Sequence, residues 1–273
     1  MKKTIRARLI VLSVLVAAVC LLALLAPLLA PYDPYSADAG NILAAPSAAH
    51  WFGTDDLGRD EFSRILMGLR SSLGAALLVV LLSNILGGLL GVCGGYFGGW
   101  ADRVILWLIT TFQAFPSFLL AVVIAGFAGS GWQNACFALI AVYWSSSARL
   151  SRSIVLSERE KPYVAGAWLS GCSKVQILIQ HILPGVIPQV AANAVSQLGS
   201  VIISMAALSF LGLGALRPTS EWGVMLNEAQ KLLRRAPQLL FYVSTGLILL
   251  VLLFNLFGDA LRDSMDHRLD QSV

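Results

Sequence analysis

The feature that most constrains the fold of this 273-residue chain is a series of long apolar runs separated by polar segments. A helix of about 20 apolar residues can cross the roughly 30 Å hydrocarbon core of a bilayer. Only 12% of the residues are charged, about half the proportion usual in soluble domains. The sequence therefore predicts an all-α integral membrane protein with six transmembrane helices, at residues 9–30, 72–97, 104–128, 132–150, 188–214 and 239–258.

The first apolar run follows a basic N-terminus, a combination that also occurs in secretory signal peptides. Residues 9–30 exceed the usual apolar region of a signal peptide and further spans follow, so we interpret the run as a transmembrane helix. Of the 19 Lys and Arg residues, 12 fall on the side of the N-terminus and 7 on the other. Because cytoplasmic loops are richer in Lys and Arg, both termini are predicted to be cytoplasmic.

A polar segment at residues 158–189 interrupts the apolar runs and has the pattern of two short helices joined by a turn. Pro162 suits a first helical turn, and Gly171 suits a helix stop. Ser173 and Gln176 have the spacing of a capping box, which starts a second helix, and Pro184 is expected to end it. That helix has an apolar face, expected to pack on the protein's own helix ends or on a partner, formed by Val175, Leu178, Ile179 and Ile182.

This segment resembles the cytoplasmic loop of ATP-binding-cassette (ABC) importer permeases, whose pattern is Glu-Ala-Ala, three residues, Gly and an apolar stretch ending near Leu-Pro. Here the pattern reads Ala165, Gly166, Ala167 and then Gly171, with Ala165 in the place of Glu, and it ends at residues 182–184. In that family the loop is a coupling helix-turn-helix that docks on the ATPase subunit. The resemblance implies an ATPase-coupling role for Tyr163, Ala165, Gly166, Ala167, Gly171, Val175, Leu178, Ile182 and Pro184.

A long segment between the first two predicted spans contains HWFGTDDLGRD at residues 50–60. Its charged residues alone would indicate a solvated loop whose ion pairs contribute little. The segment also resembles the FGTDxxGRD signature of one permease subfamily, the second membrane subunit of dipeptide, oligopeptide and nickel importers. The pattern of that subfamily continues, in family order, at residues 94–102, 115–116, 208–214, 221–225 and 255–263.

The resemblance implies the type I ABC importer permease fold, with an N-terminal tail, first helix and external loop at residues 1–71 and a five-helix permease core at residues 72–273. It implies a multi-pass subunit of the bacterial inner membrane that works with a homologous permease, two ABC ATPases and an extracytoplasmic substrate-binding protein. ATP and Mg²⁺ would be bound by the ATPases, and this chain would hold no cofactor. The cargo would be nickel, free or chelated, or short peptides, and residues 169–171 and 218–225 are more similar to nickel permeases.

Two patterns inside the predicted spans indicate how the helices are used. Gly87, Gly91 and Gly95 repeat every four residues, which permits close helix packing, and Pro116 should kink or interrupt the third span. Polar residues on one face of the fifth span either hold helices together or line an aqueous path. Together with Gln113 of the third span, the candidates for the translocation path are Asn193, Gln197, Ser200 and Ser204.

Other classes of membrane protein are weaker interpretations. A stand-alone secondary transporter usually carries charged coupling groups within its spans, and the span interiors here lack Asp, Glu, Lys and Arg. An intramembrane enzyme would need a catalytic pair, and no predicted span contains His. The chain has no GxxxxGKS/T phosphate loop, so an ATP-driven importer needs a separate ATPase. The cysteines and histidines lack metal-site spacing, and the net charge of +4 is too scattered for nucleic-acid binding.

Overall fold

The computed structural model describes residues 2–269, and its regular secondary structure within that range is helical, which confirms the predicted all-α class. Two short elements accompany the α-helices, a 3₁₀ turn at Ala39–Asn41 and a π-helical turn at Leu178–Ile182. The α-helices are α1 (Lys2–Leu29), α2 (Glu61–Phe97), α3 (Gly99–Gln113), α4 (Ser117–Ala128), α5 (Trp132–Arg159), α6 (Pro162–Leu169), α7 (Lys174–Ile177), α8 (Leu183–Phe210), α9 (Trp222–Lys231) and α10 (Pro237–Leu269).

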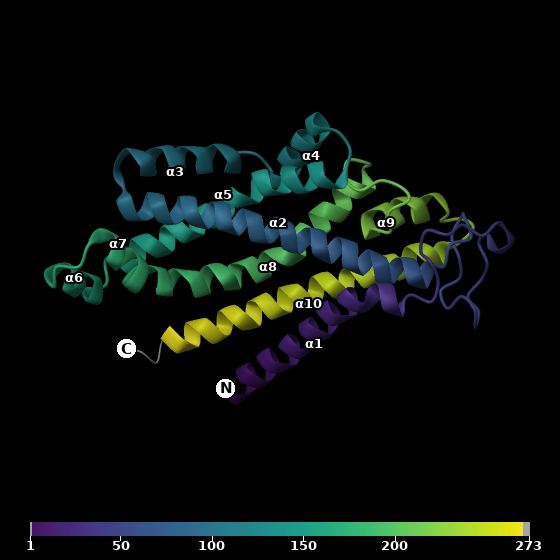
Figure 1. Ribbon diagram of the computed structural model, residues 1–273, viewed down its shortest axis with the longest axis horizontal. Coiled ribbons are helices and arrows are strands. Elements are labelled where there is room, and N and C mark those ends of the chain that lie inside the picture. Colours follow the sequence, from purple (N-terminus) through teal and green to yellow (C-terminus); the bar gives the residue numbers. More distant parts are fainter. Residues whose placement is uncertain (1, 270–273) are drawn as a thin grey trace.

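The long helices lie lengthwise in the molecule (Figure 1). α2 packs against α5, α8 packs against α2, α5 and α10, and α1 packs against α2 and α10. α1 begins and α10 ends toward the end of the molecule that carries α6 and α7, whereas α9 lies at the opposite end. The start of α1, the end of α10 and the polar segment thus share one end, as predicted, while the side of the membrane that this end faces stays a prediction.

The number of membrane spans is supported only in part. Four helices are long and apolar enough to cross a bilayer, namely α1, α2, α10 and the continuous stretch from residue 174 to residue 210. The bent pair of α3 and α4 makes a fifth if it counts as one span. The predicted span at 132–150 lies in α5, which has 28 residues but carries Ser145, Ser146, Ser147 and Arg149. The count of six therefore stays a prediction.

The predicted span at residues 104–128 is not one straight helix. It is divided into α3 and α4, which meet at an angle of 90°. Pro116 precedes the first residue of α4, and a proline both lacks an N–H donor and disfavours helical backbone at the residue before it, Phe115. The interruption expected from Pro116 is confirmed.

Two helices begin earlier than the predicted spans do. α2 begins at Glu61 instead of residue 72, because the Asp60 carboxylate caps it and accepts a hydrogen bond from the Ser63 N–H at 2.8 Å. The boundary between residues 71 and 72 that separated the two predicted parts of the chain therefore falls inside α2. α8 begins at Leu183 instead of residue 188, since the backbone stays helical from α7 through the π-helical turn.

The glycine stripe on α2 packs directly on α5, as predicted. A Cβ atom at Gly91 would lie 2.3 Å from the carbonyl oxygen of Ala148, and one at Gly87 would lie 2.3 Å from that of Trp144. At Gly95 the nearest atom, the carbonyl oxygen of Arg152, would be 3.0 Å away. Any side chain at these positions would force the two helices apart.

Gly91→Val should therefore reduce the stability of the folded subunit strongly. Overpacking a close contact costs about 1–3 kcal/mol or more, and here the clash is with backbone that cannot rotate away. Gly74→Val is the matched control, because Gly74 lies on the same helix and a Cβ there would meet nothing within 4 Å. Thermal unfolding in detergent measures the difference, and equal melting temperatures for the two variants would contradict the packing argument.

The segment at residues 30–60, which we call the cap, is folded and is not the solvated loop that its charges indicated. Asp55 and Arg59 of its signature are almost fully buried. Gly58 has φ of 76°, and a Cβ there would lie 1.8 Å from the carbonyl oxygen of Asp38, so the turn requires glycine. The expectation of weak, exposed ion pairs is wrong, because the cap folds back on itself and against α9 and excludes water from these charges.

These buried charges pair with one another across the cap, α2 and α9. Asp55 accepts hydrogen bonds from Arg59 at 2.6 Å and from Arg64 at 2.5 Å. Glu228 accepts hydrogen bonds from the same two guanidinium groups, at 3.1 and 2.7 Å. The Nε of Arg217 lies 2.5 Å from Oε1 of Glu228. We call these five residues the charge clamp, and it fastens the cap to α9.

Candidate coupling segment and translocation surface

The polar segment at residues 158–189, which we call the coupling segment, has the two-helix form that its sequence predicts. Pro162 occupies the first turn of α6, where its missing N–H costs nothing. Gly171 lies in the turn with φ of 81°, a conformation that strains other residues. Ser173 and Gln176 form the capping box at the start of α7, with hydrogen bonds of 2.8 and 3.3 Å.

The end of the second helix differs from the prediction. Pro184 does not stop it, because α7 runs through the π-helical turn into α8 without a break. Pro184 lies in the first turn of α8. A wider turn with i to i+5 hydrogen bonding precedes it, which lets the helix continue where a proline ring would otherwise meet the preceding turn.

The π-helical turn also changes which side chains are buried. Val175 and Ile179 of the predicted apolar face are exposed, at 57% and 56% of their surface. Ile182, also of the predicted face, is fully buried together with Ile177, which lay outside that face, in a cluster with Val155 and other residues of α2, α5 and α8. The predicted face assumed a regular α-helix, and residues five apart share a face where the helix widens to a π turn.

Glu158 at the end of α5 anchors the segment, a role that sequence reasoning did not assign to it. Its carboxylate is buried and accepts hydrogen bonds from the Lys161 ammonium at 2.6 Å and from the Tyr163 hydroxyl. It packs against Gly185, where a Cβ would lie 2.9 Å from the carboxyl carbon. The Tyr163 hydroxyl also lies 3.3 Å from the carbonyl oxygen of His181. Glu158 therefore ties α5 and α6 to the start of α8.

Tyr163 should ionise only at unusually high pH. Burial, with the hydrogen bond to Glu158 and its negative charge, raises the pKa of Tyr163 to about 12. Because the folded pKa lies above the ordinary value of 10.0, the stabilisation that Tyr163 provides is complete below pH 10 and is lost as the pH rises toward 12. Glu158→Gln should move the pKa back toward 10. Tyrosinate absorbance, taken as the difference from a Tyr163→Phe variant, measures both values, and an unchanged pKa in Glu158→Gln would exclude this role of the carboxylate.

A group of exposed apolar side chains lies on α6, α7 and the π-helical turn. Leu169 is 90% exposed and Trp168 47%. Exposed apolar residues gathered in one place indicate a binding surface. We call this group the coupling surface, and it consists of Tyr163, Trp168, Leu169, Val175 and Ile179.

The other residues predicted for coupling are divided between the surface and the interior. Ala167 and Ile182 are buried and Leu178 is half-buried, so they hold the segment in place. The exposed positions, which a partner can reach, are Ala165, Gly166, Gly171 and Pro184.

The predicted polar face of α8 has mixed surroundings. Gln197 is half-buried and accepts a hydrogen bond from Asn84 of α2 at 2.9 Å. Ser204 is buried, with its hydroxyl 3.1 Å from that of Tyr143 on α5. Asn193 lies 3.4 Å from a guanidinium nitrogen of Arg262 on α10. Among the four candidates Ser200 is exposed, and so is Gln113, the last residue of α3.

Asn84 and Ser147 complete a polar contact inside the helix bundle that sequence reasoning missed. Asn84 accepts a hydrogen bond from the Ser147 hydroxyl at 3.0 Å and donates to Gln197. The contact therefore joins α2, α5 and α8 at one level. The sequence did offer a signal for this contact, because Asn84 is an amide within an otherwise apolar predicted span. Such a group needs a hydrogen-bond partner inside the membrane.

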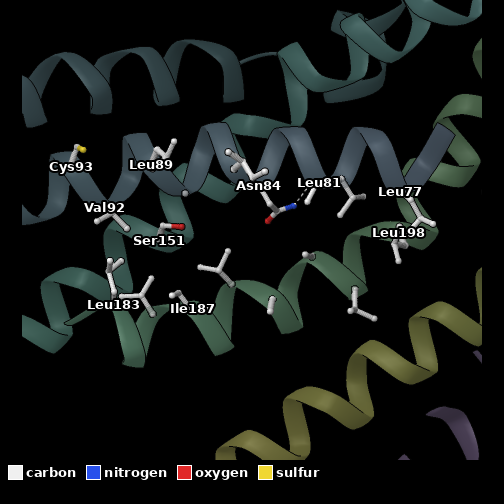
Figure 2. A pocket seen from close by; sticks show the side chains of 18 of the residues that line it. Leu77, Leu81, Asn84, Leu89, Val92, Cys93, Ser151, Leu183, Ile187 and Leu198 are labelled. Carbon is white, nitrogen blue, oxygen red and sulfur yellow. Dashed lines mark hydrogen bonds between the residues drawn. The ribbon is translucent and has the colours of Figure 1, made fainter. Parts of the chain in front are cut away.

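Asn84 also borders an apolar groove of about 780 Å³ between α2 and α8. Figure 2 shows Asn84 and Ser151 among apolar side chains such as Leu81, Leu89 and Ile187. Within residues 2–269, no group of three His, Cys, Asp or Glu side chains is arranged to hold a metal ion. The α8 wall of this groove is apolar, and Asn84 of α2 and Ser151 of α5 supply its amide and hydroxyl groups.

Comparison with known proteins identifies the family. Residues 83–271 match the model of the binding-protein-dependent transport system inner membrane component family. The chain belongs to this family. It is a membrane permease subunit of the type found in dipeptide, oligopeptide and nickel importers, and a transport subunit rather than an enzyme.

Curated relatives cover nearly the full length of this permease. It is 38% identical to the nickel transport system permease protein NikC of Escherichia coli K12, over 94% of this chain and 92% of NikC. It is 43% identical to the glutathione transport system permease protein GsiD of Pectobacterium atrosepticum, over 88% and 80% of the two chains. It is 39% identical to the dipeptide transport system permease protein DppC of Alkalihalophilus pseudofirmus, over 94% and 84%.

A solved structure shares the fold of this permease. A chain of the inward-facing MetNI methionine ABC transporter matches with a TM-score of 0.54 and 18% identity, over 74% of this permease and 96% of that chain. At this identity the match supports the fold alone. The family and the apolar helices indicate a multi-pass inner-membrane protein.

Proposed function

We propose that this permease pairs with a homologous permease and lines half of a translocation path for nickel, free or chelated, or for short peptides. The relatives named for nickel, glutathione and dipeptide transport support this range of cargo. The polar residues of α8, with Asn84 and the groove between α2 and α8, supply the surface for such a path. An extracytoplasmic binding protein would deliver the cargo at the end that carries the cap.

Conformational changes driven by ATP hydrolysis in the ATPase subunits would be transmitted to this path through residues 160–184. The observation that carries this proposal is the coupling surface, because five apolar side chains lie exposed on a segment that is itself anchored by a buried core and by Glu158. An apolar patch on a rigid support suits the docking of a partner protein. Two ABC ATPases, which bind ATP and Mg²⁺, would dock there from the cytoplasm.

Cargo can be identified with the importer reconstituted in vesicles with all its subunits. We expect ATP-dependent uptake of ⁶³Ni²⁺, supplied free or with a chelator, in preference to a labelled dipeptide. Uptake of the dipeptide alone would select the peptide alternative, and uptake that persists without the ATPase subunits would favour a stand-alone secondary transporter.

The cytoplasmic orientation of the coupling segment needs its own test. Single cysteines at Ser36, in the cap, and Ser173, in the coupling segment, are exposed in the structure. In a variant that lacks the four native cysteines, an impermeant thiol reagent added to intact cells should label the first position and not the second. The reverse labelling pattern would place the coupling segment outside and exclude ATPase docking. The native cysteines to be replaced are Cys20, Cys93, Cys136 and Cys172.

A further inference from the structure

A second pocket, of about 300 Å³, lies where the end of α2 meets α5, α6 and α7. This volume is at the lower end of the range for small-molecule sites, roughly 300–1,000 Å³. Its walls combine aromatic rings with two cations, in contrast to the apolar groove between α2 and α8. We call it the headgroup pocket, and it is lined by Tyr96, Phe97, Arg159, Val164, Trp168 and Lys174.

The two cations of this pocket are not neutralised within the described residues 2–269. Neither Arg159 nor Lys174 forms an ion pair there. Asp102 of the neighbouring α3 is held by Arg152 through two hydrogen bonds, of 2.5 and 2.7 Å. Glu158 is likewise occupied by Lys161 and Tyr163. The pocket therefore has an excess of positive charge.

Neighbouring groups fix the guanidinium of Arg159 and the backbone of Lys174. A guanidinium N–H of Arg159 donates to the carbonyl oxygen of Gly95 at 2.7 Å, which leaves the other nitrogens free for a ligand. The buried Tyr96 hydroxyl donates to the carbonyl oxygen of Lys174 at 2.7 Å and so fixes the backbone that carries the ammonium group. An anion entering the pocket would meet a guanidinium already held in place and an ammonium group on a fixed backbone.

The pocket lies where the apolar stretch of α2 ends. Phe97 is the last residue of that candidate span and is 57% exposed. Trp100 and Trp107 of α3 are also highly exposed, and exposed aromatic residues of this kind mark the headgroup level of a bilayer. Basic pockets between helix ends at this depth suit anionic lipid headgroups.

We propose that the headgroup pocket binds the phosphate of an anionic lipid, with Arg159 and Lys174 contacting the phosphate oxygens and Phe97 and Trp168 flanking the glycerol and the start of the acyl chains. A lipid bound there would join α2 to the coupling segment. The proposal does not depend on the cargo or on ATPase docking.

The test uses the purified importer complex in detergent, titrated with phosphatidylglycerol or phosphatidylcholine and analysed by native mass spectrometry. Each basic residue near an anionic headgroup contributes about fivefold in affinity. We therefore expect Lys174→Gln to weaken phosphatidylglycerol binding about fivefold and Arg159→Gln with Lys174→Gln about 25-fold. The control is the double variant Arg103→Gln with Arg149→Gln, which removes the same charge from exposed positions outside the pocket. Its affinity for phosphatidylglycerol should change less than twofold.

Three outcomes would overturn the proposal. Equal weakening in the control pair would mean that overall charge, not the pocket, attracts the lipid. Displacement of the lipid by millimolar inorganic phosphate would mean a site for the free anion. Loss of ATPase association in Lys174→Gln with lipid binding unchanged would mean that the pocket receives an acidic protein side chain. Lys174 is chosen for the single variant because only its backbone makes a hydrogen bond, so folding should persist.

Discussion

Replacing Glu228 by alanine should destabilise the permease by about 3–5 kcal/mol, the cost expected when one partner of a buried charge cluster is removed. Its carboxylate is buried and accepts hydrogen bonds from both Arg59 and Arg64. Without it, the buried guanidinium groups of Arg59 and Arg64 share Asp55, with Glu61 3.9 Å from Arg64, in a site closed to water. At about 2–4 °C per kcal/mol, the melting temperature of the complex in detergent should fall by roughly 10 °C.

Asp56→Ala is the matched control for this experiment. Asp56 also pairs with a guanidinium of the clamp, that of Arg217 at 3.1 Å, but both side chains are partly exposed. An exposed pair is worth about 0–1 kcal/mol, so this variant should melt close to the unmodified protein. If Glu228→Ala and Asp56→Ala melted at the same temperature, the charge clamp would not hold the cap to α9.

Leu169→Asp should abolish most of the association between this permease and its ATPase partners, while the two permeases still pair. The side chain is 90% exposed and supports no core, so its replacement leaves the fold intact. A charge placed in the centre of an apolar contact must be buried without a partner, which costs several kcal/mol. We expect a loss of at least tenfold in ATPase captured per permease pair, measured by affinity purification, with a matching loss of stimulated ATP hydrolysis.

Leu57→Asp provides the same chemical change at the opposite end of the molecule. Leu57 is an exposed leucine of the cap, so capture of the ATPases should be unaffected. Full capture and full stimulation with Leu169→Asp would mean that the coupling surface is not where the ATPases bind. The headgroup pocket shares only Trp168 with the coupling surface, so it could then still bind lipid through Arg159 and Lys174.

Much of the helical framework could be predicted from short-range features. The apolar runs predicted the long helices, and the capping box of Ser173 and Gln176 predicted the start of α7. Pro116 predicted the break between α3 and α4, and the spacing of the α2 glycines predicted close packing on a neighbour. These features depend on backbone hydrogen bonding or on the size of side chains within a few residues of one another. They can therefore be recognised without knowledge of the rest of the fold.

Only the tertiary structure determined which side chains are buried and which residues bury them. Val175 and Ile177 are both apolar and two residues apart, yet Val175 is exposed and Ile177 is buried in a cluster with Val155 of α5 and Val186 of α8. Gln197 faces Asn84 while Ser200, one turn later, is exposed. Asp55 is buried because Glu228 and the arginines, far apart in sequence, meet at the cap.

Sequence alone determined that this chain is helical and built for a membrane, because helix formation and hydrocarbon crossing follow from local composition. Burial follows from contacts between distant segments, which local composition does not specify.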